Sequence, residues 1–535
     1  MSNSYARTIV ATALALTSIQ LVTETRVQKG GIENMRHEIY PSLTRRSLLK
    51  YSAWISAASA FPRLAMAFAQ DVSPVMEKLS AYMAEARNRA LPKNVARETK
   101  HHILDTFAAM VSGSELLPGR LAIQFARAYG GQKIATVLAS PILCGPIEAA
   151  FANGQLAHSD ETDDDFTTGG AHPGCAVVPA ALALGEQFGI SGAHFLRAVA
   201  LGYDIALRAM KTVGPGMKET HNLVGTMGGS AAAGCVAGLS AQQMRWLLDY
   251  AAQQAGAGIG AWRRDTEHVE KAFLFGAMGA RNGVNAALVV HQGWSGVNDV
   301  LSGPNNFVES YNAKADPAGM IDQLGVVYGV MLTTLKKWTT GGPIQAPLDA
   351  LENLQKRQPF QADQVEKVVV RTATSAAYTV NNRDMPDICL QHLVAVMLLD
   401  KTVSFRAAHD KARMQDPAVL RQRAKVQLVP DEELEKLIPV RVAIVEVTLN
   451  DGTKLSERVE HVRGTPDNPM KPGEVVAKAR ELMTPVLGAA TCSKLIEGVL
   501  ALDNVKDIRE LRPLLRGPDR AKQSSIPNVA LNQQG

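Results

Sequence analysis

The stretch NGQLAHSDETDDDFTTGGAHPGCAVVPAALALGE, residues 153–186, decides how the rest of the chain is organised. Helical apolar spacing from Ile147 to Leu156 leads into it, and a second apolar helix is predicted from about Val177. Between these helices lie His158, His172 and an acidic run made of Asp160, Glu161, Asp163, Asp164 and Asp165. Most charge runs are solvated loops, but catalytic groups concentrate at helix ends on a rigid scaffold. Two imidazoles and a glycine turn lie directly beside the acidic run, and this arrangement favours a functional site over a solvated loop.

Metal binding is the first alternative for this stretch. A calcium loop that began at Asp160 would need glycine at position six and glutamate at position twelve, where the chain has Asp165 and Ala171. A metal held by His158, His172 and aspartates remains an alternative, although no H-x-x-x-H pair supports it. No C-x-x-C pair occurs among the five cysteines, Cys144, Cys175, Cys235, Cys389 and Cys492. The spacing therefore predicts no metal, no iron–sulfur cluster and no other cofactor.

The N-terminal segment has the pattern of a twin-arginine export signal. Thr44-Arg45-Arg46-Ser47-Leu48-Leu49-Lys50 is followed by a short apolar segment and by Ala65-Met66-Ala67-Phe68-Ala69, which has small residues before a cut after Ala69. Residues 1–69 are therefore predicted to be an extension and a signal peptide, with Met35 as an alternative start. The expected location is the bacterial periplasm.

Charge and apolar patterning exclude two classes of partner for the mature chain. Residues 1–69 hold eight of the 56 basic and three of the 51 acidic residues, which leaves 48 of each sign. A neutral chain gives no argument for nucleic acid. No later stretch is expected to supply the roughly 20 apolar residues of a membrane span.

The mature chain changes character along its length. Residues 71–335 show helical apolar spacing and short loops, which predicts a bundle of many helices. Strand patterns at Val365–Thr372, Val440–Leu449 and Leu455–Val462, with Asn450-Asp451-Gly452 as a hairpin turn, predict a smaller α+β domain over 336–460. Residues 461–516 return to helical spacing and are expected to pack on the first domain, and 517–535 form a loose tail.

Lysines offer a second lead to the site. Lys271 lies in an apolar segment, where an inward-facing ammonium needs a charge partner. Lys336 and Lys337 precede a small-residue turn that ends in Gly341-Gly342-Pro343. His221 stands just before Gly225–Gly234, which we expect to be a loop that enters a close-packed helix. A solvated pair is the plainer interpretation of Lys336 and Lys337, but together these cations would suit a substrate with several carboxylates.

These residues resemble a known family. The chain is similar to the MmgE/PrpD family of 2-methylcitrate dehydratases, cis-aconitate decarboxylases and iminodisuccinate epimerases over roughly Val72 to Leu515. The motifs that carry the resemblance are AHSDETDD with HPGCAVVPAALAL, Gly202-Tyr203-Asp204, the His221/Gly225 segment, Lys271 with its glycine-rich helix, and VNNRDMPDICLQHLVAVMLLD. The resemblance implies a mainly α protein with a large all-helical domain, a smaller α+β lid, a cleft between them and a homodimer.

The resemblance also implies site residues. The predicted catalytic residues are Asp160 or Glu161, Asp165, His172, His221, Lys271 and Lys336. The predicted substrate-binding residues are His158, Asp164, Gly225 and Lys337. Three departures accompany these assignments: Asp165 stands where the family has threonine, the family's aspartate is replaced by glutamate if its counterpart is Glu161 rather than Asp160, and decarboxylase-like members have a histidine where this chain has Gly341. The export signal is a further departure, since the family is usually intracellular.

The expected function is that of a metal-independent lyase of the dehydratase type, which removes a proton α to a carboxylate of a small hydroxy-polycarboxylate. Decarboxylation, or epimerisation of a related polycarboxylate, is the alternative, since all three reactions share a carbanion-like intermediate. Two alternatives without chemistry stay open. They are a periplasmic polycarboxylate-binding protein without turnover and a helical structural protein.

Overall fold

Helices α7 (Pro146–Ala157) and α8 (Gly174–Phe188) flank the acidic run, so the two helices predicted on either side of it are confirmed. Pro146 begins α7 at the first helical position, where a missing N–H costs nothing. The computed structural model describes residues 72–166, 171–217, 219–256 and 267–518. The predicted signal peptide and nearly all of the predicted tail lie outside these residues.

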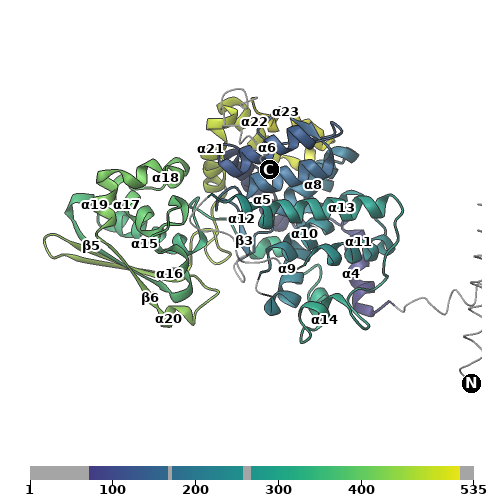
Figure 1. Ribbon diagram of the computed structural model, residues 1–535, viewed down its shortest axis with the longest axis horizontal. Helices are drawn as coiled ribbons and strands as arrows, with labels where there is room; N and C mark the ends of the chain where they lie inside the picture. The colour runs from purple at the N-terminus through teal and green to yellow at the C-terminus, as the bar shows by residue number, and fades with distance from the viewer. Residues whose placement is uncertain (1–71, 167–170, 218, 257–266, 519–535) are drawn as a thin grey trace, which may run out of the picture. The chain divides into compact units, whose positions relative to one another are not determined.

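A first hydrophobic core gathers most of the helices in the described part of the chain (Figure 1). Besides α7 and α8, the helices around it are α4 (Pro74–Glu85), α5 (Lys93–Gly113), α6 (Leu117–Tyr129), α9 (Gly192–Val213), α10 (His221–Val236), α11 (Ala241–Gln254), α13 (Met278–His291), α14 (Phe307–Tyr311), α21 (Pro472–Leu487), α22 (Ala489–Leu500) and α23 (Arg512–Leu515). Helices α21 and α22 contact α5, so part of the 461–516 segment packs with the helices that precede residue 335. The fold is mainly α, as predicted.

Helix α10 packs against α8, α9 and α13. A Cβ on Gly225 would lie 3.1 Å from the Cβ of Ala176 and 3.2 Å from the Cα of Gly279, so small residues allow these helices to approach closely. The predicted loop at 225–234 is therefore wrong, because this segment lies inside α10. The glycine-rich composition reflects close helix packing rather than a turn.

One helix is long and apolar enough to cross a membrane by length and composition. It runs from Val269 to His291 through α12 (Val269–Ala272), a π-helical turn at Phe273–Ala277 and α13. The expectation that no stretch would reach this length is wrong for this segment. In the described structure, 61% of its most apolar window is buried inside the molecule, as in the core helix of a soluble protein.

A second core lies under a four-stranded sheet with the order β6-β5-β7-β8. Its strands are β5 (Val365–Ala373), β6 (Val426–Asp431), β7 (Ala443–Leu449) and β8 (Lys454–Val459). Helices α15 (Gly342–Arg357) and α17 (Leu390–Asp400) pack on one face of this sheet (Figure 1). The smaller helices of this region are α16 (Thr374–Val380), α18 (Phe405–His409), α19 (Pro417–Arg423) and α20 (Glu432–Glu435).

The three predicted strands and the hairpin between β7 and β8 are confirmed, with slightly different bounds. Strand β6 was not predicted. It pairs parallel with β5 at the edge of the sheet, and most of its residues are exposed or half-buried, so it lacks a clear alternation. The described residues, all of which follow residue 71, belong to one compact unit, and the predicted domain boundaries within it stay predictions.

Candidate active site

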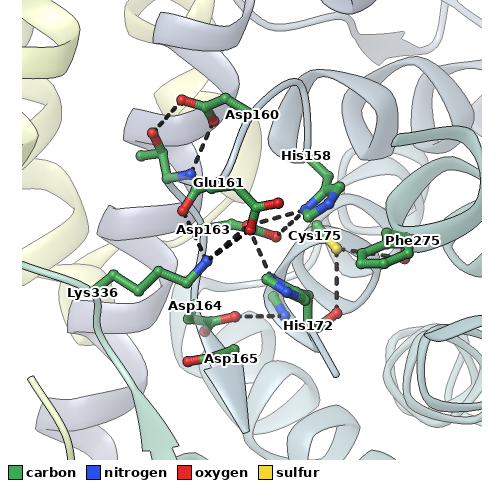
Figure 2. Close-up of polar contacts among 12 residues, drawn as sticks. His158, Asp160, Glu161, Asp163, Asp164, Asp165, His172, Cys175, Phe275 and Lys336 are labelled. Carbon is green, nitrogen blue, oxygen red and sulfur yellow. Dashed lines mark hydrogen bonds and ion pairs between the residues drawn. The ribbon is translucent and has the colours of Figure 1, made fainter. Parts of the chain in front are cut away.

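Two short strands bring Lys336 to the acidic run. Strand β3 (Asp165–Phe166) pairs antiparallel with β4 (Thr333–Thr334), with Asp165 opposite Thr334. The Lys336 ammonium, which is 1% exposed, donates to the carbonyl oxygen of Glu161 at 2.8 Å. It also lies 3.6 Å from Glu161 Oε2 and 3.9 Å from Asp163 Oδ1. Figure 2 shows Lys336 reaching these carboxylates from the side opposite His158 and His172.

Lys271 supplies a second ammonium to the same carboxylate. Its Nζ contacts Glu161 Oε1 and lies 4.9 Å from the centre of the Phe275 ring. Burial lowers the pKa of Lys271 to about 7, and the nearby Lys336 charge acts in the same direction. Asp387 and Asp160 oppose this lowering, and the contact with Glu161 also favours the protonated form. The predicted need for a charge partner is confirmed. The lowered pKa places the titration of Lys271 near neutral pH.

Asp163 orients two imidazoles at once. Its carboxylate lies 3.0 Å from Nδ1 of His158 and 3.1 Å from Nδ1 of His172. Burial opposes ionisation of Asp163, but the two histidines outweigh burial and hold its pKa well below the usual range. An ionised carboxylate accepts hydrogen bonds, so both Nδ1 atoms carry protons and Nε2 of His172 is left for acid–base work.

Two further histidines on the wall of the same cavity, His221 and His268, each contact a carboxylate. Nδ1 of His221 contacts Glu219, and the His221 ring stacks on Phe275 with centroids 3.4 Å apart. Nε2 of His268 lies 3.0 Å from Asp387. Burial lowers the pKa of His268, but Asp387 outweighs burial and raises it overall. The contact between His268 and Asp387 was not predicted, because no local pattern links residues 119 apart. Glu219 was also not predicted, although it stands only two residues before His221.

The cavity has a volume of about 840 Å³. Its wall contains six residues predicted as catalytic, namely Glu161, Asp165, His172, His221, Lys271 and Lys336. The other charged residues on its wall are Lys211, Glu219, His268 and Arg441. An apolar side of the wall includes Met210, Met217, Val380, Met385 and Ile388. A space this size, rich in cations and buried acid–base groups, suits a small polyanion.

Two predicted acidic residues lie off the cavity wall. Oδ2 of Asp160 is 2.9 Å from Nε2 of His409, and the same carboxylate accepts from Thr162. The Asp164 carboxylate accepts from the Tyr203 hydroxyl at 2.6 Å and from the backbone N–H of Gly174 at 3.0 Å. Both carboxylates are occupied within the protein, so of the alternatives Asp160 and Glu161 the geometry favours Glu161 for catalysis.

The other predicted substrate-binding residues are also not on this wall. His158 is fully buried behind His172, and burial lowers its pKa well below the usual value. Gly225 faces the helix interface described above. Lys337 points to Glu352 on α15, and its ammonium lies 4.2 Å from the centre of the Trp338 ring. Direct substrate contact by these three residues is not supported, because each of them already contacts other parts of the protein away from the cavity wall.

Two triads of possible metal ligands lie near the site, each with its atoms within 4.8 Å of one another: His158, Asp163 and Cys175, and His158, Glu161 and His268. Burial raises the pKa of the Cys175 thiol well above its usual value, which disfavours the thiolate that binds metal. In the second triad Glu161 already contacts the Lys271 ammonium, with Lys336 close by. Two ammonium groups repel a divalent cation at that position. These residues therefore fit a substrate anion better than a metal.

Comparison with known proteins identifies the family. The MmgE/PrpD N-terminal domain matches residues 77–319, and the MmgE/PrpD C-terminal domain matches residues 338–504. The chain belongs to the MmgE/PrpD family. The N-terminal domain match contains the acidic run and Lys271. The C-terminal domain match contains the four-stranded sheet and Arg441. Residues from both matched regions therefore line the cavity.

Three relatives of this MmgE/PrpD chain have cis-aconitate decarboxylase in their names. Human cis-aconitate decarboxylase is 27% identical over 472 residues, which cover 83% of this chain and 93% of the human protein. Cis-aconitate decarboxylase of Aspergillus terreus is 24% identical over 485 residues, covering 83% of this chain and 96% of that protein. A cis-aconitate decarboxylase-like protein of Aspergillus oryzae is 24% identical, with 83% and 97% covered. The relatives support lyase chemistry, with decarboxylation rather than dehydration as the named reaction.

Proposed function

We propose that the protein is a lyase for a small polycarboxylate, with decarboxylation of an unsaturated tricarboxylate of the cis-aconitate type as its first candidate reaction. The observation that carries this proposal is the convergence of Lys271, Lys336 and His172 with Glu161 on the wall of one cavity. Similarity to cis-aconitate decarboxylases favours this reaction over dehydration, the one expected from the sequence.

Decarboxylation needs charge stabilisation and a proton. Loss of CO2 breaks a carbon–carbon bond and leaves its electron pair on the carbon skeleton, where the neighbouring double bond and a carboxylate spread it. Preorganised cations beside that carboxylate stabilise the negative charge, which is usually the largest catalytic contribution. An imidazolium then donates its proton to the far carbon of the allylic system. Lys271 and Lys336 are suited to the first task and His172 to the second.

Dehydration of a hydroxy-polycarboxylate is the second candidate, and the position of Glu161 favours it. This carboxylate lies on the cavity wall between two ammonium groups. A substrate carboxylate that competes for those ammonium groups would free Glu161 to remove a proton α to a carboxylate. His172 or His221 would then protonate the departing hydroxide. Epimerisation shares the proton-removal step.

Incubation of the purified protein with cis-aconitate, and separately with citrate and 2-methylcitrate, tests these candidates. We expect CO2 release from cis-aconitate, whereas a rise in ultraviolet absorbance with the hydroxy acids would indicate dehydration. Turnover is expected to survive dialysis against a strong chelator, because lysines rather than a metal stabilise the charge. Activity that is lost and then restored by one metal would contradict this role of the lysines. Binding without turnover would make the protein a polycarboxylate-binding protein instead.

We also propose export by the twin-arginine route to the periplasm, and a homodimer as the working assembly. Arg45-Arg46 and the Ala-Phe-Ala sequence that ends at Ala69 support the export proposal. Replacing both arginines with lysine is expected to leave the precursor in the cytoplasm, as measured by fractionation and immunoblotting. Normal processing of this variant would contradict the proposed route.

A further inference from the structure

Arg441 places a guanidinium on the cavity wall, and its carboxylate partner differs from that of the two lysines. Arg441 lies just before strand β7, and its side chain is 29% exposed. Nη1 of Arg441 lies 2.7 Å from Oδ2 of Asp165, whose side chain is 1% exposed. Burial disfavours ionised Asp165, but Arg441, Lys336 and His172 together outweigh burial and lower its pKa. The pair is therefore a fixed charge contact at the cavity, built from distant parts of the chain.

A glycine makes room for this guanidinium. A Cβ on Gly342 would lie 2.2 Å from Nη1 and 2.6 Å from Cζ of Arg441, so any larger residue would displace the group. Gly342 is the first residue of α15, and the guanidinium packs against the backbone there. The guanidinium of Arg441 thus lies against both the Asp165 carboxylate and the Gly342 backbone.

We propose that Arg441 binds one carboxylate of the substrate and sets its specificity, while Asp165 positions the guanidinium. Asp165 is the one partner of Arg441 among the residues that the structure describes, and it meets a single Nη atom of a group with five N–H donors. The remaining donors suit the forked recognition of a second carboxylate. The inference rests on the proposed function, since it assigns a carboxylate of the same polycarboxylate.

This arrangement implies two separate anchor points in one cavity. Lys271 and Lys336 gather at Glu161, whereas Arg441 is tied to Asp165. A ligand that engages both needs at least two carboxylates. Within the tricarboxylate class proposed above, Arg441 is expected to discriminate ligands that carry the carboxylate it holds from analogues that lack this carboxylate.

Binding of unreactive analogues tests this assignment without any turnover. Tricarballylate carries three carboxylates, glutarate lacks the central one and methylsuccinate lacks a terminal one. Calorimetry is expected to show that Arg441→Met weakens tricarballylate binding about 10- to 100-fold, the value of a lost charged hydrogen bond. In the same variant, the affinity for the dicarboxylate that still carries the carboxylate held by Arg441 should fall by a similar factor. The affinity for the dicarboxylate that lacks this carboxylate should stay unchanged.

Two variants complete the experiment. Arg441→Lys keeps the charge but not the fork and is expected to lose several-fold affinity with the same ligand pattern. Arg371→Met is the matched control, because Arg371 pairs with Asp431 away from the cavity wall. Equal loss for all three ligands, or no loss for any, would overturn the assignment. If the protein turns over its substrate but Arg441→Met shows no such difference among the ligands, only the role assigned to Arg441 is wrong. If Arg441→Met shows the difference but the protein has no turnover, only the proposed reaction is wrong.

Discussion

Replacing His172 with glutamine is expected to lower kcat about 10²- to 10⁴-fold with little change in KM, the usual effect of removing a positioned acid–base group. Glutamine keeps much of the side-chain volume and a hydrogen-bond donor toward Asp163, but it cannot exchange a proton near neutral pH. Asp163 already fixes the imidazole through Nδ1 at 3.1 Å, so the loss should fall on the chemical step. Steady-state kinetics on the active polycarboxylate measures both constants.

His291→Gln provides the matched control for this substitution. His291 is exposed, packs on Phe188 and is absent from the cavity wall. Circular dichroism should show that both variants fold. If folded His172→Gln keeps near-normal kcat, then His172 is not the acid–base group and a different imidazole on the wall must carry the proton.

Replacing Lys271 with methionine is expected to raise KM about 30-fold or more. Truncating one member of a buried charged pair costs roughly 2–5 kcal/mol, because the remaining charge is left buried and unpaired. Here Glu161 would keep only the more distant ammonium of Lys336, and the substrate carboxylate would lose one of its two ammonium partners. Lys356→Met is the control, because Lys356 is on the surface and pairs with Glu352. Unchanged KM in Lys271→Met would place the polyanion elsewhere in the cavity.

The pH dependence of kcat/KM provides a second readout for Lys271. Its pKa is lowered to about 7 in the free protein, so the ammonium that attracts the polyanion is lost as pH rises through that value. The wild-type protein should therefore lose kcat/KM above about pH 7. Lys271→Arg, which stays charged, should shift this decline to higher pH. A decline at the same pH in Lys271→Arg would assign it to another group.

Local patterns were sufficient for much of the fold. The apolar spacing around 147–156 predicts α7, and the alternation before Asn450 predicts the β7–β8 hairpin. These predictions succeed because periodicity reports which face of an element is buried. They fail for the 225–234 segment and for β6, since helix packing favours glycine and an edge strand needs no clear alternation.

The candidate site was predicted in part for the same reason. The acidic run with His172 is contiguous, and a lone lysine in an apolar helix signals a buried partner, which proved to be Glu161. Pairs such as His268 with Asp387 are 119 residues apart and leave no trace in local spacing. The proton-transfer groups and the acidic run that contains Asp163 could be identified from the chain, but which carboxylate orients which imidazole could not.

Adjacent residues show where sequence reasoning ends. Lys336 and Lys337 are equivalent as a sequence pair, yet Lys336 is buried at Glu161 while Lys337 points to Glu352. Asp160 and Glu161 likewise separate, one to His409 and the other to the cavity. Residue types and spacing alone identified a mainly helical chain with a crowded polar segment and cations suited to a polyanion. Which member of each pair meets the cavity depends on β3–β4 pairing and on long-range packing, because both pairs lie in irregular segments whose side-chain directions are not set by a regular period.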